Sequence, residues 1–552
     1  MKRMKTLRLL VLGLSALVLN GIDAAACTSF LVGKAASTDG SAFITYNADD
    51  YGAFGRLIFY PAAHHAPGTM RRIVDGDTNH YLGEIPEAAE TYAVMGNINQ
   101  YQVAITETTF GGRAELVDTA GTIDYVSLMA IALQRSKTAR EAIHVMTSLV
   151  QQYGYASSGE SFSIADPDEV WIMEMIGKGS GERGAVWVAV RIPDDCISAH
   201  ANQSRIQQFA LDDKENVLYA PDVITFARKK GYFSGEDKDF SFSKAYAPAD
   251  FSAIRFCETR VWSFFNKWVK GMDKYLDYAD GKHIGTAAPM PLYVKPDRKL
   301  SVHDLMVSNR DHYEGTPFDI THDAGAGPYE APYRPTPLTW EYKGKTYFNE
   351  RPISTQQTAF TVIAQVRSNL PDEIGGVLWF GNDDPNMVAY TPVYCSAQEA
   401  PQCYNEPTAD GVTFSWKSAF WLCNWVANMV YPRYSQIFPS LEAVRDSLEA
   451  DFLARQPEVE ATALGLYRQQ PELARKWLTD YSNSAAQLMM SQWQKLGEYL
   501  IVKYNDQVIK PEKNGRFTLT PDGLGTPPER PGFTDEYKEV IVNETGDKYL
   551  VP

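Results

Sequence analysis

The chain has 552 residues, of which 44% are apolar, 12% aromatic and 22% charged, and its net charge is −16. This composition is typical of a globular protein with a sizeable core and excludes a largely disordered chain. The negative charge disfavours nucleic acid and anionic membrane surfaces as partners.

The first 26 residues have the pattern of a secretory signal. Basic residues at positions 2, 3, 5 and 8 precede an apolar run over 9–19, which is too short to span a bilayer. Alanines at 24–26 supply the small residues that signal peptidase requires. We therefore expect residues 1–26 to be removed and the mature chain to be exported to the periplasm or outside the cell. No later stretch reaches about 18 uninterrupted apolar residues, so the sequence predicts no membrane span.

Cys27 would become the first residue of the mature chain. Its α-amine, with a reference pKa of about 7.7–8.0, could then accept the proton of its own thiol, whose reference pKa is about 8.5. Activation by a terminal amine is an established device of covalent catalysis. The alternative is a lipid anchor on Cys27, which would block both groups. Lipoprotein signals usually carry a Leu-like residue three positions earlier, where this chain has Ala24.

The segments after Cys27 predict an α+β domain. Residues 27–33 and 41–46 read as two strands joined by a turn at 37–40, so a hairpin would bring the polar cluster at 47–50 back towards Cys27. Apolar spacing predicts helices over 123–135 and 139–153, between hairpin-like pairs of strands. The predicted strand pairs are 91–96 with 102–108 and 161–165 with 170–175. Strands, two helices and further strands indicate a layered α+β fold.

The C-terminal part carries fewer signals. Strands are expected at 356–367 and 376–381, helices dominate 441–504, and 511–552 is expected to be an extended strap. We expect residues 27–510 to form one elaborated catalytic domain. The six cysteines match no zinc spacing; Cys395 and Cys403 could form a disulfide or remain buried thiols. The sequence predicts no metal and no cofactor, and it leaves a homo-oligomer open.

Several motifs in this order resemble peptidase family C69. These dipeptidases belong to the N-terminal nucleophile (Ntn) hydrolases and are related to choloylglycine hydrolases and penicillin V acylases. The resemblance implies an αββα sandwich with a helical C-terminal extension. The motifs are Cys27-Thr-Ser, the turn Asp39-Gly40, the pair Asn47 and Asp49, and residues 96–109 (GNINQYQVAITETT), 164–167 (IADP), 169–174 (EVWIME), 201–206 (ANQSRI) and 314–319 (EGTPFD).

The resemblance also implies roles for single residues. Cys27 would attack an amide carbonyl, Asp49 would hold the terminal amine, and Asn47 would assist as the weaker member of the pair. Asn202 would stabilise the oxyanion of the tetrahedral intermediate.

Two further roles stay open. The acylases have an Asn for the second oxyanion donor where this chain has Glu107-Thr108, so the donor could be Thr108 or a backbone N–H, and Glu107 could instead bind the substrate's ammonium. The family places an Arg near the nucleophile, for which Arg255 matches best and Arg260 competes.

The leading hypothesis is a secreted cysteine dipeptidase that hydrolyses short peptides through an acyl-enzyme. One alternative keeps the mechanism and changes the substrate to a non-peptide amide, such as a bile-salt conjugate. The other is a lipid-anchored surface protein without catalysis. Each of Asn47, Asp49, Asn202 and Arg255 also has a purely structural interpretation as a cap, turn or ion-pair residue.

Overall fold

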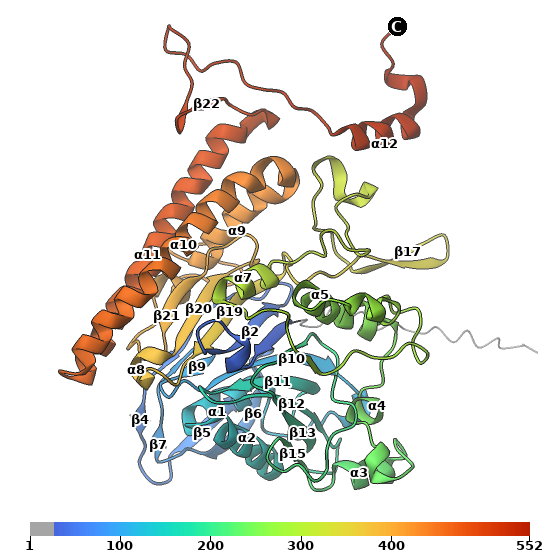
Figure 1. Cartoon of the computed structure of the whole chain (residues 1–552), viewed down its shortest axis with the longest axis vertical. Helices are drawn as coiled ribbons and strands as arrows, with labels where there is room; N and C mark the ends of the chain where they lie inside the picture. The colour runs from blue at the N-terminus through green and yellow to red at the C-terminus, as the bar shows by residue number, and fades with distance from the viewer. Residues whose placement is uncertain (1–26) are drawn as a thin grey trace, which may run out of the picture.

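Two antiparallel sheets lie at the centre of the computed structural model, with helices on both outer sides (Figure 1). The structure describes residues 27–552, so the predicted signal peptide at 1–26 lies outside the described residues. The sheets contact each other through β1 and β2 of one and β10, β11 and β12 of the other. The fold is therefore mixed α+β, as the sequence predicted.

The first sheet has seven strands and contains Cys27's own hairpin. Their spatial order is β16 (Tyr293–Val294), β14 (Ile197–His200), β1 (Ser29–Val32), β2 (Ala42–Asp49), β19 (Thr358–Val366), β20 (Val377–Asn382) and β21 (Thr391–Tyr394). The β1–β2 hairpin and the strands near 356–367 and 376–381 are confirmed. Strand β2 pairs with β19 along its whole length, which joins the N-terminal hairpin to a segment about 300 residues later.

The second sheet has eight strands. Their order is β15 (Val217–Tyr219), β13 (Ala185–Ile192), β12 (Val170–Gly177), β11 (Gly159–Ala165), β10 (Ala104–Gly111), β9 (Ile98–Asn99), β8 (Val94–Met95) and β3 (Phe59–Tyr60). The side chains of β12 alternate: Ile172 faces the first sheet, whereas Trp171 and Met173 face a separate core. Both faces are buried, so the strand reads as a continuous apolar run.

One predicted strand pair is wrong. The segment 91–96 does not pair with 102–108, because β8 turns directly into β9 and β10 takes β11 as its main partner. Gly96 and Gln102 both have positive φ, at 57° and 64°, and each supports a tight turn. The residues between the two predicted strands contain a short strand of their own, β9. The predicted pair 161–165 with 170–175 is confirmed as β11 and β12.

Helices α1 (Tyr125–Arg135) and α2 (Ala139–Tyr153) cover the outer face of the second sheet and confirm the two predicted helices. Each begins at a capping side chain: Asp124 accepts from the Ser127 N–H, and Thr138 accepts from the Glu141 N–H. Their apolar faces form a core with β10 to β13.

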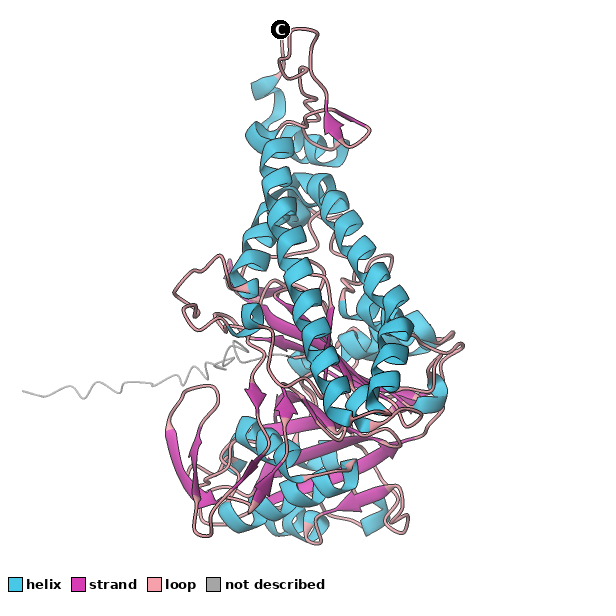
Figure 2. Cartoon of the chain, turned by 90° about the vertical axis from the view of Figure 1, so that its left-hand side faces the viewer, coloured by secondary structure: helices cyan, strands magenta, loops and turns pink. Residues whose placement is uncertain are grey.

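The outer side of the first sheet carries a longer helical layer. It contains α9 (Ala419–Val430), α10 (Tyr434–Tyr467) and α11 (Pro471–Tyr504), and the last two run side by side as long helices (Figure 2). The shorter α5 (Thr259–Trp268) packs on β14, and α7 (Val302–Asn309) packs on β19. The predicted helical region over 441–504 is confirmed, with a start seven residues earlier in α10.

The remaining segments lie outside the two main sheets. The expected strap at 511–552 contains a small hairpin and helix α12 (Asp535–Thr545), whose residues are all exposed or half-buried. Thr534 caps this helix, and two acidic residues follow in its first turn. All six cysteines are free and buried. Within residues 27–552, no helix is both long and apolar enough to cross a membrane.

Candidate active site

Cys27 lies just before the first residue of β1, beside the C-terminal end of β2. The β1–β2 hairpin extends to Thr28 and Asn47, whose backbones exchange hydrogen bonds of 3.2 and 2.9 Å. The sulfur of Cys27 is 3.6 Å from the Tyr46 hydroxyl and 3.8 Å from Oε1 of Glu107. Tyr46 also donates a hydrogen bond to Glu107. The hairpin therefore brings the polar cluster back to Cys27, as predicted.

Cys27 opens into a cavity of about 280 Å³. The cavity lies between the ends of β2 and β19, helix α1, and the turn at 75–79 that joins β5 (Met70–Val74) to β6 (Tyr81–Pro86). Most of its wall is aromatic or aliphatic, and Asp49, Asp50, Asp77 and Arg56 are its charged members. A cavity of this size and shape accommodates a small organic ligand with both apolar and polar groups.

The surroundings of Cys27 oppose formation of a thiolate. Burial raises the pKa of the thiol well above its usual range, and the negative charges of Glu107 and Asp49 raise it further. In the complete chain the nitrogen of Cys27 belongs to a peptide bond, because residues 1–26 precede it. A terminal ammonium on Cys27 would introduce a positive charge next to the sulfur and so favour the thiolate.

Asp49 is held by two groups from the same distant segment. Arg351 forms an ion pair of 3.0 Å with Oδ2, and the Thr358 hydroxyl donates to Oδ1 at 2.6 Å. Burial nevertheless raises the pKa of Asp49 to about 7, although Arg351 and Thr358 act in the opposite direction. Arg351 is not among the site residues predicted from sequence. No local pattern marks it, since its contact depends on how a loop about 300 residues away folds.

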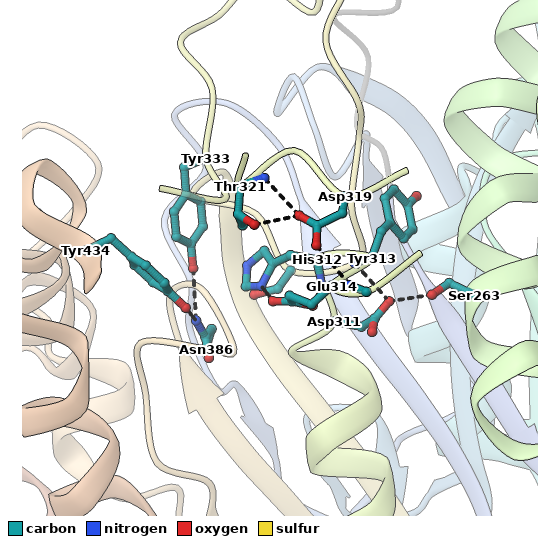
Figure 3. A network of polar contacts seen from close by, with 12 residues as sticks. Ser263, Asp311, His312, Tyr313, Glu314, Asp319, Thr321, Tyr333, Asn386 and Tyr434 are labelled. Atoms are coloured by element: carbon teal, nitrogen blue, oxygen red, sulfur yellow. Dashed lines mark hydrogen bonds and ion pairs between the residues drawn. The ribbon is translucent and has the colours of Figure 1, made fainter. Parts of the chain in front are cut away.

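The 314–319 motif supports that arginine. The Tyr313 hydroxyl donates to the Arg351 carbonyl at 2.7 Å. Polar contacts fix the backbone around Tyr313, between α5 and α10 (Figure 3). These include Ser263 with Asp311 at 2.5 Å, His312 with Glu314 at 2.9 Å, and Thr321 with Asp319 at 2.6 Å. Tyr313, the residue just before the motif, thus holds the Arg351 backbone, and Arg351 in turn binds Asp49.

Asn47 has buried partners that do not include Cys27. Its side-chain amide donates to the carbonyls of Asn309 and Ile353, both at 3.2 Å, and accepts from the Thr361 hydroxyl at 2.6 Å. These contacts connect β2 to β19 and α7. The side chain therefore anchors the strand end, and only the backbone of Asn47 contacts the residue next to Cys27.

Arg260, and not Arg255, contacts Cys27. The Arg260 guanidinium is fully buried and donates to the Cys27 carbonyl at 2.6 Å and to the Thr28 hydroxyl at 2.7 Å. Arg255 instead pairs with Glu350 and lies 4.3 Å over the Phe318 ring. Arg255 lies within a π-helical turn, Ala253–Glu258, whereas Arg260 lies in the first turn of α5 that follows it. The geometry therefore favours the competitor over the first choice made from sequence.

Asn202 joins this group from the loop after β14. Its side-chain oxygen accepts from Arg260 at 2.9 Å, and its Nδ2 donates to the Thr109 carbonyl at 2.8 Å. Its φ of 65° is uncommon outside glycine, and Asn tolerates it better than most residues. A polar network therefore holds the Asn202 amide beside Arg260, the arginine that contacts Cys27.

Thr108 is oriented away from the cavity that contains Cys27. Its hydroxyl bonds to Nδ1 of His200 at 2.7 Å, and Nε2 of His200 bonds to Ser163 at 2.7 Å. Burial and, to a smaller extent, the charge of Arg205 lower the pKa of His200 to about 3, so the imidazole is neutral at pH 7. The Thr108 side chain thus belongs to a buried network between the sheets.

A second cavity lies on the other side of this group. It has a volume of about 530 Å³, and Asn202 and Arg351 are part of its wall. The glycine turn at 111–112, Arg113 and Cys257 line it as well. Asn202 thus borders this second cavity, whereas Cys27 lines the first.

A buried thiol that lines a cavity, with a carboxylate in contact with its sulfur and a guanidinium bound to its own carbonyl, is suited to nucleophilic catalysis. Residues 26–447 match the sequence profile of peptidase family C69, and the chain belongs to this family of enzymes. This confirms the resemblance inferred from the motifs.

Curated relatives cover most of the chain. A protein named "Probable dipeptidase" from Latilactobacillus sakei is 27% identical over 75% of this chain and 82% of its own. Another of that name from Salmonella dublin is 27% identical over 67% of this chain and 81% of its own. "Dipeptidase A" from Lactobacillus helveticus is 26% identical, over 78% and 86% respectively.

Proposed function

We propose that the protein is an exported cysteine dipeptidase built as an Ntn-hydrolase αββα sandwich. Removal of residues 1–26 would free Cys27, whose thiol is the nucleophile and whose α-amine is the base. The observation that carries the proposal is the position of the Cys27 sulfur, in contact with Glu107 at the inner end of a cavity of about 280 Å³. The names of the relatives support a dipeptide as the substrate.

The first half of the proposed reaction acylates Cys27. The free α-amine takes the thiol proton, and the thiolate attacks the carbonyl carbon of the peptide bond. The Asn202 amide stabilises the oxyanion of the tetrahedral intermediate. The protonated amine then gives its proton to the departing amine as the C–N bond breaks, which leaves a thioester on Cys27.

The second half releases the acyl group. The α-amine accepts a proton from water, the resulting hydroxide attacks the thioester carbonyl, and the thiolate leaves with the proton returned to it. Asp49, held by Arg351 and Thr358, orients the amine throughout. Arg260 fixes the Cys27 carbonyl, so that sulfur and amine keep one geometry.

Two variants test this proposal. Cys27→Ala should lower dipeptide turnover by at least about 10³-fold, because no other group can form the thioester. The unaltered chain that keeps residues 1–26 should be equally inactive, because a peptide nitrogen cannot act as the base. The measurement is release of free amino acids from a dipeptide by protein with an exposed Cys27, alongside both forms. Activity retained by either form would contradict the mechanism.

A further inference from the structure

The cavity next to Cys27 contains negative charge that no described basic side chain neutralises. Glu107 and Glu160 are buried, and neither forms an ion pair with any of residues 27–552. Asp77 accepts a hydrogen bond from Tyr125 at 2.9 Å and likewise has no ion-pair partner in that range. Buried carboxylates normally have a cationic or hydrogen-bonding partner. Glu107 accepts a hydrogen bond from Tyr46 but has no cationic partner among residues 27–552, and a positively charged ligand would supply one.

Glu107 and Glu160 act as a pair on neighbouring strands. Burial raises the pKa of Glu160 well above its usual range, and the charge of Glu107 raises it further. The Oε2 atoms of both residues are buried without another partner, and a proton on Glu160 directed at Glu107 satisfies both. Thr109 binds the other oxygen of Glu160 at 2.8 Å. Glu160 therefore carries the proton, and Glu107 carries the charge.

The charge of Glu107 is placed where a substrate amine would lie. Its Oε1 is 3.8 Å from the Cys27 sulfur. In a peptide with a free amino terminus, the α-nitrogen is only two bonds from the carbonyl carbon that the sulfur attacks. A peptide positioned for attack therefore brings its ammonium next to Glu107.

Asp77 adds a second carboxylate at the rim. It lies on the exposed turn between β5 and β6 and lines the same cavity, and its charge contributes to the raised pKa of Glu107. Arg56 is the basic residue of the described wall. Its guanidinium donates to the Ala409 carbonyl and lies 5.0 Å over the Phe54 ring. Arg56 therefore has other partners and forms no ion pair with Glu107 or Asp77.

The carboxylates are not grouped as metal ligands. Among residues 27–552, no set of three or more His, Cys, Asp and Glu side chains is placed to hold a metal ion. Glu107 lies behind the wall, in contact with Cys27, and the wall that Cys27 and Asp77 share includes the apolar residues Ile58, Met129, Leu133 and Phe360. This combination favours an organic amine that carries an apolar group.

We propose that this cavity is the subsite for the first residue of a peptide with a free amino terminus and an apolar first side chain. Glu107 binds the α-ammonium, Asp77 reinforces that charge from the rim, and the apolar wall receives the side chain. The inference rests on the proposed function and deepens it, because it states why an unblocked dipeptide would be accepted.

The test compares Phe-Ala, N-acetyl-Phe-Ala and Glu-Ala as substrates of protein with an exposed Cys27. Phe-Ala should have a kcat/KM at least about 100-fold above the acetylated peptide, because acetylation removes the charge that Glu107 binds. Glu-Ala should be at least about tenfold poorer than Phe-Ala, because its side chain brings a negative charge to Asp77.

Asp77→Asn should raise KM for Phe-Ala about three- to tenfold, less at high salt because Asp77 is exposed, and should leave the acetylated peptide unchanged. Asn keeps the acceptor for Tyr125. Asp75→Asn is the matched control: Asp75 lies on the same turn and binds Thr78 at 2.8 Å but does not line the cavity. Its KM should stay within about twofold of the unaltered protein.

Alkylation of Cys27 by iodoacetamide gives a readout that does not need turnover. 2-Phenylethylamine should protect the thiol at concentrations at least about tenfold below those of 2-phenylethanol, which has the same ring and no charge. Equal protection by the two, equal hydrolysis of free and acetylated Phe-Ala, or equal effects of the Asp77 and Asp75 variants would overturn the inference. If Phe-Ala is not hydrolysed at all while the amine still protects Cys27, only the proposed function fails.

Discussion

At the scale of single residues, Arg260 is the centre of the polar group around Cys27. Its guanidinium reaches the Cys27 carbonyl, the Thr28 hydroxyl, the Ala201 carbonyl and the Asn202 side chain, all within 3.1 Å. A planar guanidinium can serve four acceptors at fixed angles, which an ammonium cannot. One side chain therefore fixes the positions of Cys27 and Asn202 relative to each other.

The two arginines make a matched pair of variants. Arg260→Lys should lower kcat/KM for a dipeptide by about 100-fold or more, because it loses most of these contacts. Arg255→Lys should cost less than about threefold, because its contacts with Glu350 and Phe318 lie away from Cys27. Steady-state kinetics, with thermal melting of both proteins as a folding control, provides the measurement. A larger loss in the Arg255 variant would restore the assignment first made from sequence.

The Glu107–Glu160 pair predicts a pH dependence. Burial raises the pKa of Glu107 to about 6, against the hydrogen bond from Glu160, which lowers it. Glu107 is thus charged above that pH and neutral below it. If Glu107 binds the ammonium, KM for a dipeptide should rise about tenfold between pH 7 and pH 5, since one carboxylate is being protonated.

Two substitutions of Glu160 test whether its effect on Glu107 comes from its hydrogen-bond donor or from the size of its side chain. Glu160→Gln keeps a hydrogen-bond donor to Glu107. The pH at which KM rises on the acid side should therefore stay within about half a pH unit of that of the unaltered protein. Glu160→Met removes the donor and should raise that pH by about one unit, because the Glu107 anion loses a hydrogen bond. Identical profiles for the two variants would show that Glu160 does not set the charge of Glu107.

At the scale of elements, buried ion pairs join the C-terminal helices to the first sheet. Arg310 binds Glu449 of α10 at 2.9 Å, and Arg367 binds Glu460 of the same helix at 2.9 Å. Arg310 lies just after α7, and Arg367 just after β19. The long helices are thus connected to the same strands and loops that hold Asn47 and Asp49, although they contribute no residue to the cavity at Cys27.

Two glycines in these helices test their packing. Gly497 of α11 is in contact with α9, and a Cβ there would lie 2.0 Å from the Trp425 ring, whereas a Cβ at Gly465 of α10 would meet nothing within 4 Å. Gly497→Ala should destabilise the protein by about 1–3 kcal/mol through overpacking. Gly465→Ala should stabilise it by up to about 1 kcal/mol through helix propensity. Thermal or denaturant unfolding measures both, and a neutral Gly497 variant would refute the close contact.

At the scale of the whole molecule, the two sheets assemble the site from distant parts of the chain. Cys27 and Asp49 come from the first sheet, Glu107 comes from the second, and Arg351 comes from a loop outside both. Contacts between residues so far apart in sequence form only when the sheets pack. The site is therefore a property of the assembled sandwich and of no single segment.

The state of the N-terminus is the whole-molecule prediction. Protein exported by its native host should begin with an unmodified Cys27, because the proposed mechanism needs both the amine and the thiol. Mass spectrometry of the N-terminal peptide measures this directly. A diacyl or triacyl Cys27 would block both groups and would favour the lipid-anchored alternative.

The sequence by itself determined what local pattern and composition encode. It predicted the α+β class, the β1–β2 hairpin, α1 and α2, and the family, because apolar periodicity, turn residues and ordered motifs are local properties. Residues at the two ends of one hairpin, such as Cys27 and the 47–50 cluster, could be placed together from a single turn.

Only the tertiary structure decided the contacts made across the sandwich. Arg351 and Glu160 carry no local signal, and the choice between Arg255 and Arg260 depended on which guanidinium reaches Cys27 in the folded chain. Burial is also a tertiary property, and it raises the pKa values of Asp49 and Glu107. The sequence determines which ionisable side chains are present. Their protonation states and their contacts depend on which surfaces the fold removes from water.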